Sequence, residues 1–378
     1  MARILIAVSS VGLGHVARSR PLGVLLERIY GFNVDYLAPP PTNMYLEHYG
    51  IKALEASSRL SSLSKIVDEY YTLKKSGRIG FTMMLREHRI IKENSKIVDD
   101  YIDYEHYDAI LADESWELLE SKKFLKSNTK KIFMTDFLEY PYRRLADIPP
   151  ALLFNRYLWK RLGYFDLIAF VGFPDKLRLT RKVRRMKNTR IFPAGIIPPM
   201  LESEVLDRND ARRLVGAVGK SILVSLGGTS AGLDLMSRIC KILGETEYNI
   251  HIAVGASVEN YNVDACKTLG GDLKFKVPFI LKAFDVIISL SGLSSLAASI
   301  SVGIPTITIP LPGHFEQEEN AILASRKYNW ITSLSPSRLN EIKSIIEDMI
   351  QRGSSPGDRV LYDNQANIVK HIYGILKA

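Results

Sequence analysis

Short apolar runs alternate with helix-length segments along almost the whole chain, and this alternation restricts the fold more than any other feature. In the first half the runs occupy 3–10, 33–40, 107–114, 130–137 and 165–172. Alternating strands and helices need crossover connections, which predict an α/β fold with a parallel sheet covered on both faces. The segment 57–104 contains no strand-like run, so we expect two or three helices inserted there.

The pattern restarts after 189–201, "TRIFPAGIIPPML", whose adjacent prolines stiffen what we interpret as a connection. Further strand-like runs follow at 221–228, 249–256, 273–277, 285–292 and 305–311. A chain of 378 residues, 46% of them hydrophobic, is long enough to bury two cores. We predict two Rossmann-like doubly wound domains over 1–197 and 198–363, with a C-terminal helix over 364–378 that returns to the first domain.

The segment 286–313 carries no charged residue and exceeds the roughly 20 residues that span a bilayer. Glycines and prolines divide it into pieces about as long as a strand, a helix and a second strand. We therefore interpret it as a buried strand-loop-helix-strand unit.

The two cysteines, Cys240 and Cys266, predict neither a disulfide framework nor a zinc site, because no histidine or acidic residue lies near them at metal-ligand spacing. A reducing compartment fits this usage. Met1 leads directly into "ARILIAV", without the basic, apolar and cleavage regions of a secretory signal. Both observations favour a cytoplasmic protein.

Three predicted strand-to-helix junctions carry glycine: Gly12 with Gly14, Gly227 with Gly228, and Gly292. Such junctions lie at the carboxyl ends of parallel strands, where a helix N-terminus favours an anion such as phosphate. Neither GxGxxG nor GxxxxGK[ST] is present, so the pattern indicates no dinucleotide fingerprint or Walker loop. A tight turn without a ligand is as good an interpretation of Gly227 and Gly228 alone.

The order "SLGGTSAG", "FDVIISLSGLSSLAASISVGIP" and "IPLPGHFEQEENA" resembles the C-terminal half of a GT-B glycosyltransferase, in particular the MurG-like enzymes of family 28 and their archaeal relatives. "VGLGHVARSRPL" is similar to their N-terminal glycine-rich loop and histidine. The resemblance implies an N-terminal acceptor domain, a C-terminal domain for a nucleotide sugar, and metal-independent transfer with inversion. The implied donor is a UDP-sugar such as UDP-N-acetylglucosamine, and the implied acceptor is lipid-linked or membrane-associated.

The resemblance also implies roles for individual residues. The donor diphosphate would lie between Gly292, Leu293, Ser294 and Ser295 and the opposite loop, Gly227, Gly228 and Thr229. The donor sugar would contact Glu316, Gln317 and Asn320, and the base would lie against the main chain of Lys276 and Val277. Ala298 departs from the family pattern, because it stands where these enzymes usually carry a glutamate that binds the ribose.

His15 is the predicted general base, because imidazole titrates in the range needed to take a proton from an acceptor hydroxyl. Gly12 and Gly14 would let acceptor and donor approach the backbone beside it. The alternative is that His15 only hydrogen-bonds the following helix. Glu114, at the end of the "YDAILADE" run, is a second catalytic candidate, and helix capping is the alternative there too.

The net charge of +9 is concentrated in 176–190, which holds eight Lys or Arg and no acid. The preceding "RYLWKRLGYF", 156–165, mixes cations with Tyr157, Trp159, Tyr164 and Phe165. We interpret 156–190 as a surface for anionic membrane, with core aromatics and a solvated face as the simpler alternatives. Nucleic acid is less favoured because no base-stacking platform or reading motif accompanies the charge.

Two other functions stay open. A nucleotide-sugar epimerase of the same architecture would need several acid or base groups around the sugar. A non-catalytic GT-B subunit that binds or recruits would explain Ala298, whereas His15 and the intact "HFEQEENA" loop favour the enzyme.

Overall fold

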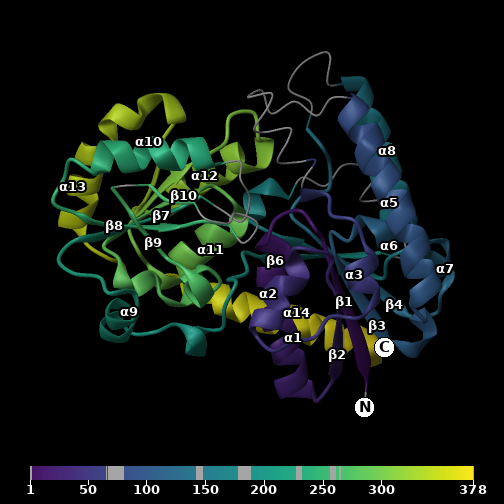
Figure 1. The fold of residues 1–378 in the computed structure, drawn as a ribbon. Helices are drawn as coiled ribbons and strands as arrows, with labels where there is room; N and C mark the ends of the chain where they lie inside the picture. The colour runs from purple at the N-terminus through teal and green to yellow at the C-terminus, as the bar shows by residue number, and fades with distance from the viewer. Residues whose placement is uncertain are drawn as a thin grey trace.

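The computed structural model describes residues 2–64, 66, 81–141, 148–177, 189–226, 232–255, 261–263 and 265–377. Two lobes lie side by side, each built around one six-stranded parallel sheet (Figure 1). The predicted two-domain α/β fold is therefore confirmed.

The first sheet has the order β2 (Asn33–Leu37), β1 (Arg3–Val8), β3 (Ala109–Asp113), β4 (Lys130–Thr135), β5 (Leu167–Val171) and β6 (Arg190–Gly195). Successive side chains of a strand point to opposite faces of the sheet. Ile4 and Ile6 therefore pack in the apolar cluster on one face, and Leu5 packs in the cluster on the other face. Both faces are buried, which explains the continuous apolar runs.

Helices cover both faces of this sheet. The Ile4 side is packed by α1 (Gly14–Tyr30), α2 (Thr42–His48) and α14 (Val360–Lys377). The Leu5 side is covered by α3 (Ala56–Arg59), α5 (Phe81–Tyr101), α6 (Trp116–Glu120), α7 (Lys122–Lys126) and α8 (Ile148–Leu162). Among the described residues, no helix is both long and apolar enough to cross a membrane.

The second sheet has the order β12 (Ile331–Ser333), β11 (Thr306–Ile309), β10 (Val286–Leu290), β7 (Ser221–Ser225), β8 (Asn249–Ala253) and β9 (Lys267–Thr268). One face packs on α10 (Leu233–Leu243) and α13 (Ile342–Arg352), and the other on α9 (Arg208–Val215) and α11 (Leu293–Val302). The charge-free segment 286–313 forms β10, α11 and β11, as expected for a buried unit.

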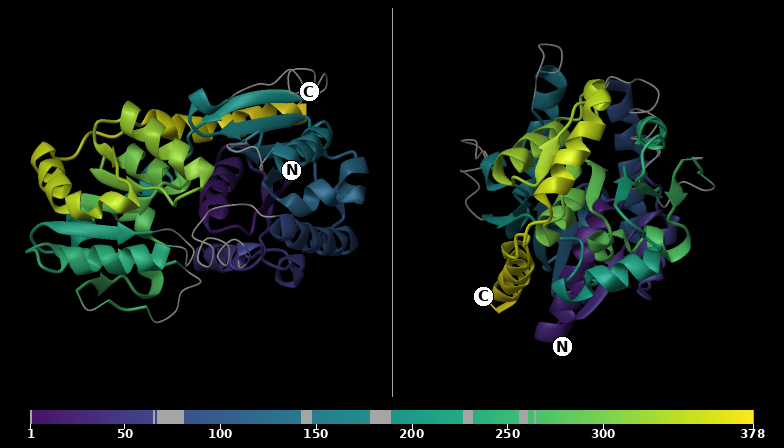
Figure 2. Two further views of the ribbon diagram at one scale, coloured as in Figure 1. Left: turned by 90° about the horizontal axis from the view of Figure 1, so that it is seen from above. Right: turned by 90° about the vertical axis from the view of Figure 1, so that its left-hand side faces the viewer.

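The C-terminal helix α14 runs from the second lobe along the first (Figure 2). Its residues Ile368 and Ile372 share one apolar cluster with α1 and α11. Gln365 Nε2 donates to the carbonyl oxygens of Pro198 and Met200, at 2.8 and 2.9 Å. The helix therefore fixes the segment that joins the two sheets.

Strand order reverses once in each sheet. In the first sheet, β2 lies on one side of β1 and β3 lies on the other side. In the second sheet, β8 lies on one side of β7 and β10 lies on the other side. Ligands of open α/β sheets bind at such switch points, beyond the carboxyl ends of the strands. The β1–β3 and β7–β10 ends therefore locate the candidate site.

Two secondary-structure expectations were wrong. The segment 189–201, expected as a connection, contains β6, which tolerates Pro193 because it is an edge strand. The segment 273–277, expected as a strand, contributes instead to the 3₁₀ turns η7 (Gly271–Lys274) and η8 (Val277–Phe279). Gly271 has a φ of +55° and Pro278 lacks an N–H donor, and both features oppose a strand.

The expectation for the cysteines was also wrong. Cys240 on α10 and Cys266 beside β9 form a disulfide, with their Cα atoms 6.1 Å apart. This distance lies within the usual range for a bridged pair. Their separation in the sequence gave no signal, because the pairing depends on how β9 is placed beside α10.

Candidate active site

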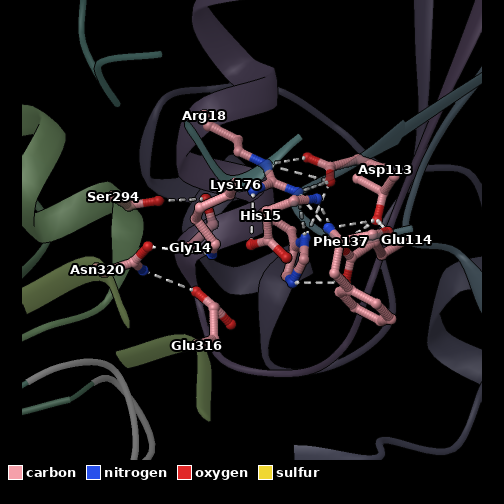
Figure 3. Close-up of polar contacts among 12 residues, drawn as sticks. Gly14, His15, Arg18, Asp113, Glu114, Phe137, Lys176, Ser294, Glu316 and Asn320 are labelled. Carbon is pink, nitrogen blue, oxygen red and sulfur yellow. Dashed lines mark hydrogen bonds and ion pairs between the residues drawn. The ribbon is translucent and has the colours of Figure 1, made fainter. Parts of the chain in front are cut away.

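The centre of the site is a hydrogen-bonded pair between His15 on α1 and Asp113 at the end of β3 (Figure 3). The His15 Nδ1 atom lies 2.9 Å from Asp113 Oδ1. A carboxylate partner holds the proton on Nδ1 and leaves the lone pair on Nε2. Because the His15 side chain is 13% exposed, Nε2 can still meet a substrate.

Asp113 is held ionised by its surroundings. Arg18 Nε lies 3.0 Å from Asp113 Oδ2, and Ser19 Oγ donates to the same oxygen at 2.7 Å. Burial opposes the charge of Asp113, but Arg18 and His15 outweigh it and lower the pKa of Asp113 to about 2. A negative charge therefore faces His15 throughout the neutral range.

That charge changes the basicity of His15. Burial and the positive charge of Arg18 lower the pKa of His15, whereas the negative charge of Asp113 raises it. The net effect places the pKa of His15 above the usual 6.5. His15 is thus a stronger base than an ordinary histidine.

Glu114 lies on the other side of the imidazole, with Oε2 3.9 Å from His15 Nε2. Its backbone φ is +48°, a left-handed conformation that non-glycine residues seldom adopt. The Glu114 Oε1 atom accepts from Thr135 Oγ1 at 2.9 Å and from the Asp136 N–H at 3.1 Å. Burial and the nearby Asp136 raise the pKa of Glu114 to about 8, so this carboxyl is protonated at neutral pH.

The second domain meets His15 through α11. Gly292 precedes the helix, and Ser294 Oγ donates to the Gly14 carbonyl oxygen at 3.0 Å. A Cβ added at Gly14 would lie 3.2 Å from Ser294 Oγ, so glycine permits this approach. The N-terminus of α11 therefore lies against the loop that carries His15.

Asn320 on α12 (Phe315–Lys327) connects the domains. Its Nδ2 atom donates to the Ser291 carbonyl oxygen and to Glu316 Oε1, both at 3.2 Å. Its Oδ1 atom accepts from Lys176 Nζ, also at 3.2 Å, and Lys176 belongs to the first domain. Because the Lys176 side chain is only 4% exposed, it places a nearly buried positive charge beside the α11 loop.

Glu316 and Gln317 differ in their surroundings. Burial and the charge of Asp136 raise the pKa of Glu316 to about 7, so Glu316 faces the acidic groups of the first domain. Gln317 instead accepts a hydrogen bond from the Leu311 N–H at 3.0 Å and braces its own loop. Of these two predicted sugar contacts, only Glu316 is brought towards the His15 centre.

A cavity lies beside this centre, between the domains. It is lined by Leu13, Gly14 and Tyr45 from the first domain and by Val277, Leu281, Ser294, Ser295 and Ala298 from the second. Lys276 immediately precedes the turn η8 (Val277–Phe279) that forms one wall. Gly227, Gly228 and Thr229 lie outside the described residues, as does most of 176–190.

Sequence reasoning gave no role to Arg18 or Lys176, and it offered Asp136 only as a weaker strand-end carboxylate than Glu114. Arg18 lies three residues after His15, a helical spacing that puts both on one face, and this signal was available. Lys176 gave none, because it stands in a basic run and its contact is 144 residues away. Among the described residues, no group of three or more His, Cys, Asp or Glu could hold a metal ion.

Solved structures share this fold at low sequence identity. A UDP-glucosyltransferase from Polygonum tinctorium is 11% identical, with a TM-score of 0.61 over 100% of this chain and 99% of its own. The glycosyltransferase SsfS6 of Streptomyces sp. SF2575, complexed with thymidine diphosphate, is 15% identical, with a TM-score of 0.56 over 99% of this chain and 100% of its own. Both proteins resemble this chain in fold.

Residues 222–371 match the family model of the glycosyltransferase family 28 C-terminal domain. A relative is the UDP-N-acetylglucosamine–N-acetylmuramyl-(pentapeptide) pyrophosphoryl-undecaprenol N-acetylglucosamine transferase of Rickettsia felis. It is 22% identical over 327 residues, which cover 79% of this chain and 88% of the relative. The protein is a GT-B glycosyltransferase whose second domain matches the family 28 C-terminal domain.

The segment that matches the family model supplies only part of the site of this glycosyltransferase. The matched segment contains α11 and α12 but neither His15 nor Lys176, which come from the first domain. Contacts between the domains, such as Ser294 with Gly14 and Lys176 with Asn320, therefore bring the matched domain beside the imidazole.

Proposed function

We propose that this glycosyltransferase moves a sugar from a UDP-sugar, such as UDP-N-acetylglucosamine, to a lipid-linked or membrane-associated acceptor, with inversion and without a metal. The observation that carries the proposal is His15, which follows the cavity residue Gly14, pairs through Nδ1 with Asp113 and keeps 13% of its side chain exposed. The acceptor hydroxyl gives its proton to Nε2, and its oxygen forms the bond to the anomeric carbon. The bond to the diphosphate breaks, and its electron pair stays on the departing oxygen.

The departing diphosphate needs positive charge. The first-turn N–H groups of α11 and the helix dipole supply part of it. Lys176, nearly buried beside the same loop and 4.0 Å from the half-exposed Glu319, supplies a cation from the opposite domain. Together these groups take the role that a metal ion has in other transferases.

Isothermal titration is expected to give micromolar UDP binding. A Ser294→Asp variant puts a carboxylate in the first turn of α11, which favours the helix but repels a diphosphate, so UDP affinity should fall by more than about tenfold. Lys176→Met removes a charge-assisted contact and should lower affinity about tenfold or more.

The matched control is Ser344→Asp, which adds the same charge in the first turn of α13, away from the interdomain site. Its UDP affinity should equal that of the wild type. If all three variants bound UDP as the wild type does, the diphosphate would not lie at α11.

The membrane part of the proposal rests on α8 rather than on the aromatic residues of 156–165. Phe165 is buried, and Trp159 donates from Nε1 to the Leu138 carbonyl oxygen at 3.1 Å, so both belong to the core. Leu152 and Leu153 are instead 53% and 65% exposed, on the helix that carries Arg156 and Lys160. Exposed leucines beside cations suit an anionic membrane surface.

Leu153→Asp is expected to lower binding to phosphatidylglycerol vesicles about tenfold or more, because it removes an apolar contact and adds repulsion. Vesicle co-sedimentation measures the loss. Leu214→Asp, on a 49% exposed leucine of α9, is the matched control and should bind normally. If both variants bound phosphatidylglycerol vesicles equally, or if the wild type bound only neutral phosphatidylcholine vesicles, α8 would not be the surface that binds an anionic membrane.

One observation favours the epimerase as a second candidate. Glu114, Asp136 and Glu316 gather near His15, and burial with mutual repulsion raises the pKa of Glu114 to about 8 and of Glu316 to about 7. Such a set of proton donors and acceptors is what an epimerase needs. Product analysis separates the two reactions.

A further inference from the structure

Two serines lie side by side at the switch point of the second sheet. Ser225 ends β7, Ser289 lies near the end of β10, and the two residues are register partners across the parallel pair. Both line the interdomain cavity. The cavity encloses about 150 Å³, some ten times what one water molecule needs, so it suits a larger ligand.

Strand alternation explains why both serines face this cavity. Leu223 and Ile287, each two residues earlier in its strand, belong to the core on the same side of the sheet. Ile222 and Ile288 point to the opposite core. The two hydroxyls therefore form a polar floor at the end of an otherwise apolar sheet face.

Ser289 has an unsatisfied polar group. The residue is 2% exposed, and its Oγ atom has no hydrogen-bond partner within the described part of the chain. A buried hydroxyl without a partner destabilises the folded state relative to one that is hydrogen-bonded. Since the residue lines a cavity, a ligand hydroxyl can supply the missing partner.

The remaining lining indicates what kind of ligand fits. Phe275 and Val277 offer apolar surface, and Ser294 marks the first turn of α11. Along α11 the cavity meets Ser295, Ala298 and Ser299, and Lys274 is the only charged side chain among its described lining residues. A nucleoside diphosphate has a flat ring, a ribose diol and an anionic tail, which match these three kinds of surface.

We propose that the paired hydroxyls of Ser225 and Ser289 bind the ribose diol of the donor nucleotide, so that neutral hydroxyls take the place of a carboxylate at Ala298. This inference rests on the proposed function, because it concerns the same donor site. Each serine hydroxyl can donate and accept, as each ribose hydroxyl can. The pair therefore satisfies the diol without burying a charge.

The test compares UDP with 2′-deoxyuridine diphosphate by isothermal titration. The wild type should bind UDP about tenfold more tightly, and Ser289→Ala should lose about tenfold in UDP affinity together with most of this preference. Because Ser289 Oγ has no hydrogen-bond partner among the described residues, the variant should unfold at the wild-type temperature or above it. If Ser289 had only a structural role, the variant would not combine weaker UDP binding and a lost preference for UDP with an unchanged or higher unfolding temperature.

Ser301→Ala is the matched control. Ser301 is buried on α11, but its hydroxyl donates to the Ala298 carbonyl oxygen at 3.0 Å and does not line the cavity. It should keep the preference for UDP. Equal wild-type affinity for the two nucleotides, or unchanged UDP binding by Ser289→Ala, would overturn the ribose assignment alone, whereas no wild-type binding of any nucleotide would overturn the proposed function as well.

Discussion

His15→Ala is expected to lower kcat about 10²- to 10⁴-fold while UDP affinity stays close to that of the wild type. The reason is that the imidazole accepts the acceptor proton, whereas the nucleotide lies on the second domain. A coupled assay of UDP release measures kcat, and titration measures affinity. A variant that lost both equally would show that His15 binds donor rather than taking the proton.

The pH profile gives a second readout for His15. The proton acceptor must be neutral, so the rate should rise with pH through an apparent pKa above 6.5, because Asp113 stabilises the imidazolium. His371→Ala is the matched control, since that ring lies on α14 and stacks on Phe192 at 3.7 Å, away from the site. It should leave both rate and profile unchanged.

Asp113→Asn is expected to have the largest combined effect on activity and stability. An amide cannot hold the Nδ1 proton as a carboxylate does, so kcat should fall by about 10²-fold or more. The buried Arg18 loses its nearest counter-charge but keeps Asp136 at 3.5 Å, so the free energy of unfolding at pH 7 should fall by about 3 kcal/mol. Denaturant titration and the coupled assay measure the two losses.

The stability loss of Asp113→Asn has a defined pH dependence. The pKa of Asp113 is lowered from 3.8 to about 2, so its stabilising charge is present above 3.8 and is lost as pH falls through 2. The difference in free energy of unfolding between the Asp113→Asn variant and the wild type should therefore become smaller below pH 4. Asp348→Asn, which weakens an exposed pair with Arg352 on α13, is the control and should cost less than about 1 kcal/mol with normal activity.

The sequence predicted the parts of the fold that local patterns encode. The charge-free segment 286–313 has two internal glycines and three prolines, and its division into β10, α11 and β11 followed from them. The strand at 190–195 was hidden because Pro193 argues against a strand anywhere but at an edge. Strands β9 and β12 have two and three residues, too few for an alternation to be visible.

Individual site residues were less accessible than the strands that carry them. His15 stood out because it follows glycine at a strand end, and Asp113 was placed beside it only by the β1–β3 register. Lys176 and the Ser225–Ser289 pair depend on contacts between segments far apart in sequence, 144 and 64 residues, which no local spacing reveals. The ends of strands were predictable, but the side chains that meet across them were not.

The product formed from a UDP-sugar and a lipid-linked acceptor in the presence of EDTA decides whether the protein transfers a sugar with inversion. Mass spectrometry and nuclear magnetic resonance identify the product and its anomeric configuration. We predict a lipid one sugar heavier, with the opposite configuration at the anomeric carbon, and formation about 10²- to 10⁴-fold slower by His15→Ala. A free or epimerised sugar without a glycosylated lipid, from wild-type protein that binds the donor, would contradict the assignment.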